Sequence, residues 1–549
     1  MKNSHSRTSQ DQDELSREAY PKLSDSFLQL IEKYGEEVQI DKGSIFFDVG
    51  QDCYDFAYVK KGAINIVDRS NDKTVVQIKE GHFLGEIGML MGQKTFLAAI
   101  ADKSSVLLKI PQEKIINLVR VNPEIGDVIV NAFAARRRLL MKWGEGGVVV
   151  IGKEIRKKTS QLIEFLSRGK IPFRFIDEQD SERLNELKQK CHHVPRAETV
   201  VVIGHTTVIC DPSPLELANA LGLDLVSDTD TLFDVLIVGA GPAGLAASIY
   251  GASEGLKVLV VEDTAIGGQA GTSSKIENYF GFPTGISGGD LAYKGEIQAI
   301  KFGARITTPR RATSLEKKDE IFHLGLNDER CVRGKSVILA NGVQYRRLPL
   351  DRLEYFENRG IYYAATDLEA KYCTDSNVVV VGGGNSAGQA AMYLCGFAKH
   401  VYVVVRGEGL SATMSSYLTN RIEQDNRIDL ITHAEICEIE GSENLERVKI
   451  KNNSNGETIE IESKALFIMI GAVPNTNWLN GEICLDDKGF VCTDKDADNE
   501  ALAFETSLPG VYAVGDIRSG SVKRVASAVG EGSVVISSVH KYLSKTAVK

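Results

Sequence analysis

Cysteine pairs and long apolar runs are what this sequence lacks most. Its nine cysteines are scattered and none forms a C-x-x-C pair, which excludes a recognisable zinc ribbon, leaves no expected metal site and is typical of a reducing compartment. No apolar run approaches the roughly 18 residues that a bilayer span needs. The polar first residues also lack the apolar core of a signal peptide. We therefore expect a cytoplasmic protein without a membrane span.

An excess of positive charge is absent as well. The chain has 64 Lys and Arg against 74 Asp and Glu, a net charge of −10. Proteins that bind nucleic acid usually present a basic face, so we expect no nucleic-acid partner. The triplet Arg136–Arg138 is expected to lie on the solvated face of a helix rather than against DNA.

The length of 549 residues is too great for one hydrophobic core and favours three to four domains. Residues 1–20 are polar and predict a flexible tail. In residues 21–146, short β-type runs precede a helix with an apolar stripe, which predicts a small barrel or jelly roll with a C-terminal helix. Residues 147–224 follow the order βαβαββα of a thioredoxin-like α/β unit. From residue 231 onward, strand–glycine–helix units dominate.

The first of these units carries a dinucleotide motif. An apolar run, Phe233–Val238, is followed by Gly239-Ala-Gly241-Pro242-Ala243-Gly244, which opens an Ala-rich helix. Gly239 permits the tight turn, Gly241 lets the backbone approach a pyrophosphate, and Gly244 lets helix and strand pack closely. The helix N-terminus attracts the phosphates. Glu262, which ends the next strand, can accept hydrogen bonds from ribose hydroxyls.

A second unit repeats the pattern further along the chain. The run Asn377–Val381 precedes Gly382-Gly-Gly384-Asn385-Ser386-Ala387, which opens another Ala-rich helix. The next strand ends in Arg406 instead of an acid. An arginine there suits a 2′-phosphate, which favours NADPH over NADH. The alternative is a solvated arginine at a strand end, and NADH stays possible.

These two units, with Gly515-Asp516 near the C-terminus, resemble the low-molecular-weight thioredoxin reductases over about residues 231–549. The resemblance implies two nested Rossmann-type α/β domains, one binding FAD (231–346 and 480–549) and one binding NAD(P)H (347–479). Val525 stands where the family has glutamine. The residues that the resemblance places at FAD are Gly239, Gly241, Pro242, Ala243, Gly244, Glu262, Gly267, Gly268, Gln269, Asn278, Asn341, Gly342, Gly515, Asp516, Arg524, Val525 and Ala526.

The family's redox C-x-x-C is missing here, because Ala364 and Asp367 stand where its two cysteines belong. Neither residue can attack a disulfide or resolve a mixed disulfide. We therefore expect an FAD-dependent oxidoreductase that passes electrons from NAD(P)H to an unidentified acceptor, which could be a small molecule, O₂ or a redox protein. Asp367 could donate a proton near the flavin or merely cap a helix. The alternatives are a thioredoxin reductase that uses another cysteine, such as Cys373, and a regulatory flavoprotein that senses redox state or nucleotide.

The stretch Gly81–Ala101 resembles the phosphate-binding cassette of cyclic-nucleotide-binding domains. The resemblance implies that Gly85 offers backbone N–H groups and that Glu86 accepts the ribose hydroxyl. Thr95 replaces the family's phosphate-binding arginine, and Lys94 could substitute as a point charge. A cyclic nucleotide is therefore a possible ligand and the domain a possible sensor.

The thioredoxin-like unit has no cysteine after its first strand, and Val200 occupies the position that usually holds a cis-proline. A docking or spacer role is the stronger interpretation. We also expect a homodimer, from the family resemblance and from the apolar helix stripe at residues 125–140.

Overall fold

The computed structural model describes residues 15–547 with a few gaps. These gaps are Cys53, Ile155, residues 191–194, Arg196, residues 224–230, Ser274, Asn358, Thr366, residues 411–413, Asn480 and residues 494–501; for Gln189, Lys190, Asp367, Leu368 and Ala547 only the backbone is described. Within the described parts of the chain, no helix is long and apolar enough to cross a membrane.

The N-terminal domain consists of two four-stranded antiparallel sheets that share one core. One sheet has the order β1 (Glu36–Ile40), β8 (Ser105–Ile110), β3 (Phe56–Lys61), β6 (Phe83–Leu84), and the other the order β2 (Ile45–Phe47), β7 (Ala98–Ala101), β4 (Ala63–Asp68), β5 (Lys73–Lys79). Its helices are α2 (Asp25–Glu32), α3 (Ile87–Met91), α4 (Gln112–Val121) and α5 (Pro123–Trp143).

Helix α5 corrects two expectations from the sequence. Most of its apolar stripe is buried within the chain, with Ile129 and Phe133 fully buried in the core of the N-terminal domain, so the stripe does not support a dimer interface. Arg136 and Arg137 are only 5% and 2% exposed, whereas Arg138 reaches solvent and pairs with Glu18. The expectation of a solvated arginine face was wrong for two of the three residues, because α5 is covered on more than one side. The homodimer remains a prediction from the family resemblance alone.

The thioredoxin-like unit follows directly. Its elements are β9 (Val148–Gly152), α6 (Lys157–Arg168), β10 (Arg174–Asp177), α7 (Ser181–Lys190), β11 (Thr199–Ile203), β12 (Thr207–Cys210) and α8 (Pro214–Ala220). The sheet order is β10-β9-β11-β12, with β10 parallel and β11 antiparallel to β9. Helix α8 begins with a capping box formed by Ser213 and Glu216, which satisfies free amides of its first turn.

The first Rossmann domain is built on the parallel sheet β16 (Arg305–Thr307), β15 (Val258–Val261), β14 (Val235–Val238), β20 (Val337–Leu339), β31 (Val511–Ala513). Every residue of β14 and β15 is buried, as expected for strands covered on both faces. A second sheet has the order β13 (Leu232–Phe233), β19 (Cys331–Gly334), β18 (Ile321–Leu326), β17 (Ala312–Lys318). The helices are α9 (Pro242–Ser253), α10 (Gly288–Phe302) and α15 (Val525–Ala547), with short 3₁₀ turns η1 (Ala270–Thr272) and η2 (Gly515–Ile517).

The second Rossmann domain lies between two paired connecting strands, β21 (Val343–Tyr345) and β30 (Ala472–Pro474). Its parallel sheet has the order β22 (Ile361–Tyr362), β29 (Ala465–Ile468), β23 (Asn377–Val381), β24 (His400–Val404), β25 (Ile428–Ile431), and β26 (Ala434–Glu440), β27 (Arg447–Asn452) and β28 (Thr458–Glu462) form a further sheet. The helices are α11 (Leu353–Phe356), α12 (Asp367–Tyr372), α13 (Asn385–Leu394) and α14 (Ser416–Gln424).

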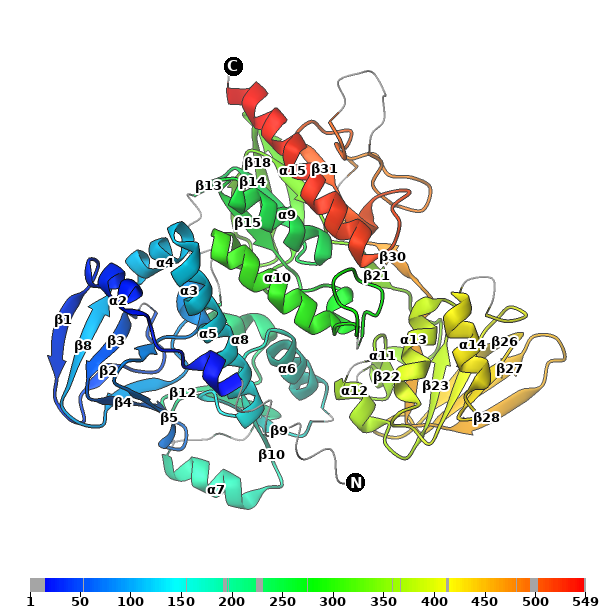
Figure 1. Cartoon of the computed structure of the whole chain (residues 1–549). Coiled ribbons are helices and arrows are strands. Elements are labelled where there is room, and N and C mark those ends of the chain that lie inside the picture. The colour runs from blue at the N-terminus through cyan, green and yellow to red at the C-terminus, as the bar shows by residue number, and fades with distance from the viewer. Residues whose placement is uncertain are drawn as a thin grey trace.

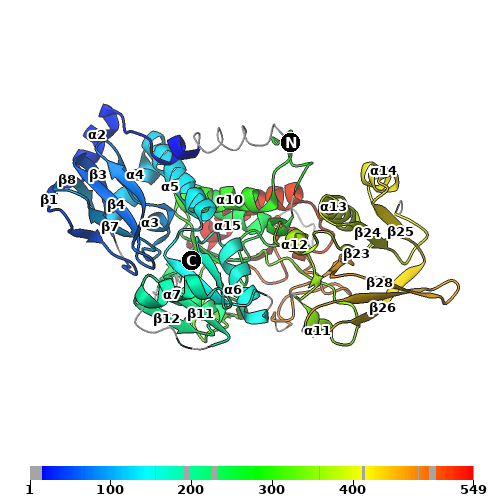
Figure 2. The same ribbon diagram turned by 90° about the horizontal axis from the view of Figure 1, so that it is seen from below.

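The thioredoxin-like unit occupies a central place among these parts. In Figure 1 it lies below α10 of the first Rossmann domain, with the N-terminal domain on one side and α12 of the second Rossmann domain on the other. The view from below shows α6 beside α12 again (Figure 2). A hydrogen bond from Arg174 to Ser70 joins the unit to the N-terminal domain, and one from Tyr372 to Glu154 joins it to the second Rossmann domain.

Candidate functional site

The glycine turn after β14 leaves open space in front of a helix N-terminus. Gly239 has a φ of +104°, and a Cβ on Gly244 would lie 1.9 Å from the carbonyl oxygen of Gly239. Gly241 is the N-cap of α9, and a Cβ placed on it would have no other described atom within 4 Å. The free amides and partial positive charge of this helix end suit a pyrophosphate. We call this turn, with Glu262 and the turn Gly267–Gln269, the first cradle.

Glu262 ties the loops of the first cradle together. Its Oε2 accepts a hydrogen bond from the Ala240 amide at 2.7 Å, and its Oε1 accepts one from the Thr264 amide at 3.0 Å. Burial raises the pKa of this carboxyl group, although the backbone amides lower it. The side chain is therefore positioned beside the glycine turn, where the sequence places a partner for ribose hydroxyls.

The turn Gly267-Gly268-Gln269 lies directly against the first glycine motif. Gly267 and Gly268 have φ values of +103° and +54°, and a Cβ on Gly268 would lie 3.1 Å from the Cα of Gly241. The Gln269 side chain donates a hydrogen bond of 2.6 Å to the Val343 carbonyl, at the strand that leaves the domain. The turn thus extends the first cradle from the pyrophosphate position toward the domain crossing. Asn278 is exposed on the loop after η1.

Two asparagines meet where the chain crosses between the Rossmann domains. Asn341 Nδ2 donates to the Asn475 carbonyl at 2.7 Å, and Asn475 Nδ2 donates to the Asn341 carbonyl at 2.8 Å. The Oδ1 atom of each side chain is buried without a hydrogen-bond partner among the described residues. Buried acceptors of this kind require an explanation, and a bound ring with N–H donors supplies one. The adjoining Gly342 has a φ of +57°.

The C-terminal motif closes the same site. The Gly515 amide donates to Glu531 at 2.7 Å, and a Cβ on Gly515 would lie 3.0 Å from that of Ala243 in α9. Burial raises the pKa of Asp516, while Lys523 lowers it. Helix α15 then begins at Val525, which is half-buried, with Arg524 and Ala526 exposed beside it.

The second glycine motif forms a matching cradle before α13. Gly382 has a φ of +142° and a Cβ there would lie 2.2 Å from the Met469 carbonyl oxygen. Gly384 caps α13 and faces open space, and Asn385 Oδ1 accepts a hydrogen bond of 2.7 Å from the Ser415 amide. Ser386 is exposed and Ala387 is buried. Arg406 is exposed just beyond β24, within the loop that a nucleotide 2′-phosphate would meet.

The segment that carries cysteines in the family holds alanines here. Ala365 is buried in the core of the second Rossmann domain and Ala364 is half-buried. Thr366 and the side chain of Asp367 lie outside the described residues, so a proton-donor role for Asp367 stays a prediction. Cys373 is fully buried, its thiol donates to the Glu369 carbonyl, and burial raises its pKa to about 12.

The cassette of the N-terminal domain lines a mainly apolar pocket that includes Gly85, Glu86 and Thr95. Its polar groups are already engaged. Glu86 is paired with the guanidinium of Arg137 at 2.8 Å. The Thr95 hydroxyl donates to the Asp48 carbonyl and accepts from the Gln51 amide. Lys94 does not line the pocket and instead lies 3.6 Å from Asp52, so the structure does not bring it to the place of the missing arginine.

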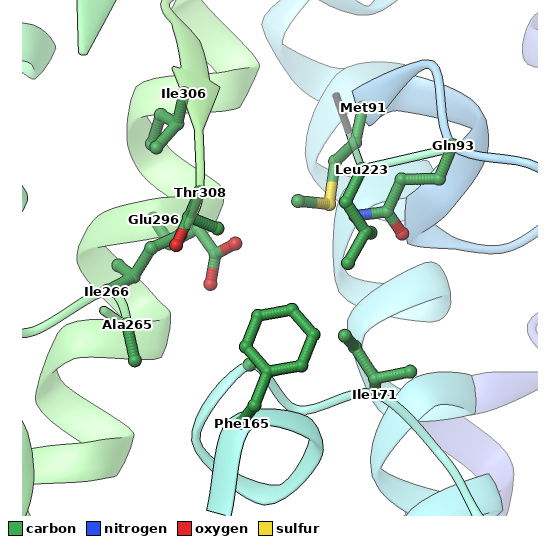
Figure 3. A pocket seen from close by; sticks show the side chains of 11 residues that line it. Met91, Gln93, Phe165, Ile171, Leu223, Ala265, Ile266, Glu296, Ile306 and Thr308 are labelled. Atoms are coloured by element: carbon green, nitrogen blue, oxygen red, sulfur yellow. The ribbon is translucent and has the colours of Figure 1, made fainter. Parts of the chain in front are cut away.

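A buried pocket that the sequence did not reveal lies where three domains meet (Figure 3). It is lined by Met91 and Gln93 of the N-terminal domain, Phe165, Gly169 and Ile171 of the thioredoxin-like unit, and Leu223, Ala265, Ile266, Glu296, Ile306 and Thr308. Glu296 of α10 is 6% exposed, and burial raises its pKa to about 7 although Arg137 and Lys170 lower it. Because these segments are far apart in sequence, no local pattern marks the pocket.

Comparison with known proteins agrees with this geometry. Residues 233–532, more than half of the chain, match the family model for pyridine nucleotide-disulphide oxidoreductases. The chain belongs to this family. Residues 37–122 match the cyclic nucleotide-binding domain. The predicted enzyme class, an FAD-dependent oxidoreductase fused to a cyclic nucleotide-binding domain, is confirmed.

Two thioredoxin reductases each match a little over half of this chain. The thioredoxin reductase of Mycoplasmopsis pulmonis is 32% identical over 305 residues, which are 55% of this chain and 95% of that protein. The NADPH-dependent thioredoxin reductase 3 of Arabidopsis thaliana is 34% identical over 325 residues, 58% of this chain and 60% of that protein. The solved thioredoxin reductases of Lactococcus lactis and T. acidophilum each align with a TM-score of 0.52 over 57% of this chain and 99% of theirs, at 28% and 30% identity.

Proposed function

We propose that this protein transfers electrons from NAD(P)H through FAD to an acceptor that is not the disulfide of thioredoxin. The observation that carries the proposal is the contrast between two intact cradles and a segment between β22 and α12 without cysteine. Bound FAD accepts a hydride from the nicotinamide and can pass electrons onward. The open helix ends at Gly241 and Gly384 suit the two dinucleotides.

Cys373, which follows the altered segment in the sequence, does not supply the missing relay. A dithiol relay needs a thiolate with access to its partner. Burial of Cys373, with its pKa raised to about 12, leaves this thiol protonated and enclosed. An acceptor other than thioredoxin therefore fits the chain better than a thioredoxin reductase with a displaced cysteine.

Anaerobic stopped-flow mixing tests the electron input and output separately. The purified flavoprotein is mixed first with NADPH and then with NADH, and flavin bleaching gives each rate. The reduced protein is next mixed with O₂, a ferredoxin, a quinone or an oxidised thioredoxin. We expect bleaching by the nicotinamide nucleotide and reoxidation by one of the first three. Fast reoxidation by thioredoxin that is lost in Cys373→Ala would contradict the proposal.

Arg406 is proposed to select NADPH, since its guanidinium follows β24 where the 2′-phosphate would lie. In Arg406→Ala, the apparent KM for NADPH should rise by about tenfold and that for NADH should change little. Equal changes for both nucleotides would instead assign Arg406 to the solvated surface.

We also propose that the N-terminal domain regulates flavin reduction. Arg137 connects the two parts, because it pairs with Glu86 of the cassette and lies close enough to Glu296 of α10 to lower its pKa. Helix α10 packs on the first cradle, where a Cβ on Gly267 would lie 2.6 Å from the Ala292 side chain. A ligand that competes for Glu86 would shift this network. Flavin reduction is therefore to be measured with cyclic AMP and cyclic GMP; no response to either would remove cyclic nucleotides as regulators.

A further inference from the structure

The segment from Glu154 to Arg168 of the thioredoxin-like unit, which includes α6, contacts both Rossmann domains. Before its N-terminal end, Glu154 accepts a hydrogen bond of 2.6 Å from Tyr372 of α12. At its C-terminal end, Arg168 donates one of 3.3 Å to the Gly268 carbonyl in the first cradle. Figures 1 and 2 both show α6 beside α12, and Figure 3 shows Phe165 of α6 beside Glu296 of α10. The unit is thus packed against the cofactor domains rather than tethered beside them.

The guanidinium of Arg168 lies at the edge of the first cradle. Besides donating to Gly268, it forms an ion pair with Glu164 at 3.3 Å on its own helix. Burial raises the pKa of both Glu262 and Tyr345, and the positive charge of Arg168 opposes that rise. A guanidinium carries five N–H donors, so donors remain for a ligand. Its side chain is 24% exposed, which means that it is largely, but not completely, covered.

Arg168 contacts Gly268, and Gly268 packs against Gly241 at the expected pyrophosphate position. Arg168 donates to the carbonyl of Gly268, and a Cβ placed on Gly268 would lie 3.1 Å from the Cα of Gly241. Gly241 caps α9 and opens onto the space that the sequence motif assigns to a pyrophosphate. A pyrophosphate brings two negative charges to this helix end, and arginine binds phosphate oxygens with paired, charge-assisted hydrogen bonds.

We propose that Arg168 of the thioredoxin-like unit binds the pyrophosphate of FAD, so that this unit is part of the cofactor site. The unit has no cysteine directly after its first strand, and the arginine at the C-terminal end of its helix α6 contacts the first cradle of the neighbouring domain. A purely structural role, in which Arg168 only joins two domains through Gly268, predicts a different pattern of ligand affinities.

Ligand titration of the full-length apoprotein distinguishes the two roles. FAD, ADP and adenosine are titrated into the wild type, Arg168→Met and Arg168→Lys. Binding of FAD is followed by quenching of its fluorescence, and binding of ADP and adenosine by their competition with FAD. Both FAD and ADP carry the pyrophosphate, whereas adenosine does not. In Arg168→Met, the dissociation constants for FAD and ADP should rise by about tenfold or more, with adenosine unchanged. Arg168→Lys should recover part of the loss because it keeps the charge.

Two matched controls complete the test. Glu164→Gln removes the helix partner of Arg168, and Arg183→Met removes an arginine that is 63% exposed on α7 of the same unit; neither should weaken FAD binding. Unchanged FAD and ADP affinities in Arg168→Met would overturn the proposal. An equal loss for adenosine would also overturn it, since that result means the cradle has shifted as a whole. If the wild-type protein binds FAD and its flavin is reduced by NADPH, the proposed function is supported, whichever result the Arg168 variants give.

Discussion

At the scale of single residues, burial and pairing distinguish side chains that look alike in the sequence. Arg136 and Arg137 are neighbours on α5, yet Arg136 donates to three backbone carbonyls, those of Ala19, Phe83 and Gly85. Burial lowers its pKa to about 10. Arg137 instead binds the Glu86 carboxylate. One arginine thus holds the N-terminal segment on its domain, while the other joins the cassette to α5.

Cys373 offers a test of the absent thiol chemistry. Because burial raises its pKa to about 12 and the side chain is fully buried, almost no thiolate forms near neutral pH. We expect Cys373 to react with iodoacetamide far more slowly than Cys437, which is exposed on β26. Peptide mass mapping after brief labelling measures both rates. Rapid labelling of Cys373 in the folded protein would show that this thiol is accessible and reactive after all.

Glu296 predicts a dependence of stability on pH. Its pKa is raised from 4.5 to about 7 in the folded chain, so between these values the unfolded state has released a proton that the folded state keeps. The free energy of unfolding should therefore fall as the pH rises through this window. Above about pH 7 the ionised, buried Glu296 carboxylate destabilises the folded state to its full extent. Glu296→Gln should raise the Tm relative to the wild type at about pH 8 and much less at about pH 5.

Thermal unfolding of both proteins across this pH range measures the effect. Glu354→Gln is a matched control, because Glu354 is 77% exposed and pairs with Arg347 at the surface. A Tm difference between the wild type and Glu296→Gln that does not vary with pH would contradict the assignment of the titration to Glu296.

At the scale of elements, two glycines at the start of α9 serve different purposes: Gly244 allows close packing, and Gly241 leaves space for a ligand. A Cβ on Gly244 would collide with the Gly239 backbone, whereas one on Gly241 meets no other described atom within 4 Å. Gly244→Ala should therefore lower the apoprotein Tm by several degrees, as a forced shift of packed backbone costs about 1–3 kcal/mol. Gly241→Ala should leave the apoprotein Tm unchanged and weaken FAD binding, because the new methyl group stands where the pyrophosphate approaches.

Thermal unfolding of the two apoproteins and titration with FAD measure these effects. The reverse outcome, a destabilised Gly241→Ala apoprotein with normal FAD affinity, would mean that the space in front of α9 is filled by the chain itself.

At the scale of the whole molecule, a hydrogen bond from Tyr372 to Glu154 joins the thioredoxin-like unit to the second Rossmann domain, and we expect it to restrain α12. Tyr372→Phe removes this hydrogen bond and should increase hydrogen exchange at the amides of α12, while the exchange rates of the β23 amides stay unchanged. Tyr355→Phe is the control, since Tyr355 donates to the Ser442 carbonyl within the same domain. Equal exchange at α12 in Tyr372→Phe and wild type would show that this contact does not restrain the domain.

The sequence sufficed for the two cradles because each is a local pattern. A strand, a glycine turn and a helix are contiguous, and the roles of Gly239, Gly241 and Gly244 follow from backbone sterics over a few residues. The loss of the C-x-x-C at Ala364 is likewise visible in a few letters. Other features were not visible in the sequence, because each depends on a partner far along the chain. These features are the hydrogen bonds of Glu86 and Thr95, the outward position of Lys94 and the burial of Arg137.

By itself, the sequence determined that the C-terminal part carries two dinucleotide motifs and lacks a C-x-x-C pair. Only the tertiary structure decided what the thioredoxin-like unit contacts, because the partners of Arg168 and Glu154 lie 100 and 218 residues away. Contacts over such separations are set by the packing of whole domains, which brings groups together through buried surface rather than through any local motif. The unit, which has no cysteine directly after its first strand, thereby lies against the first cradle.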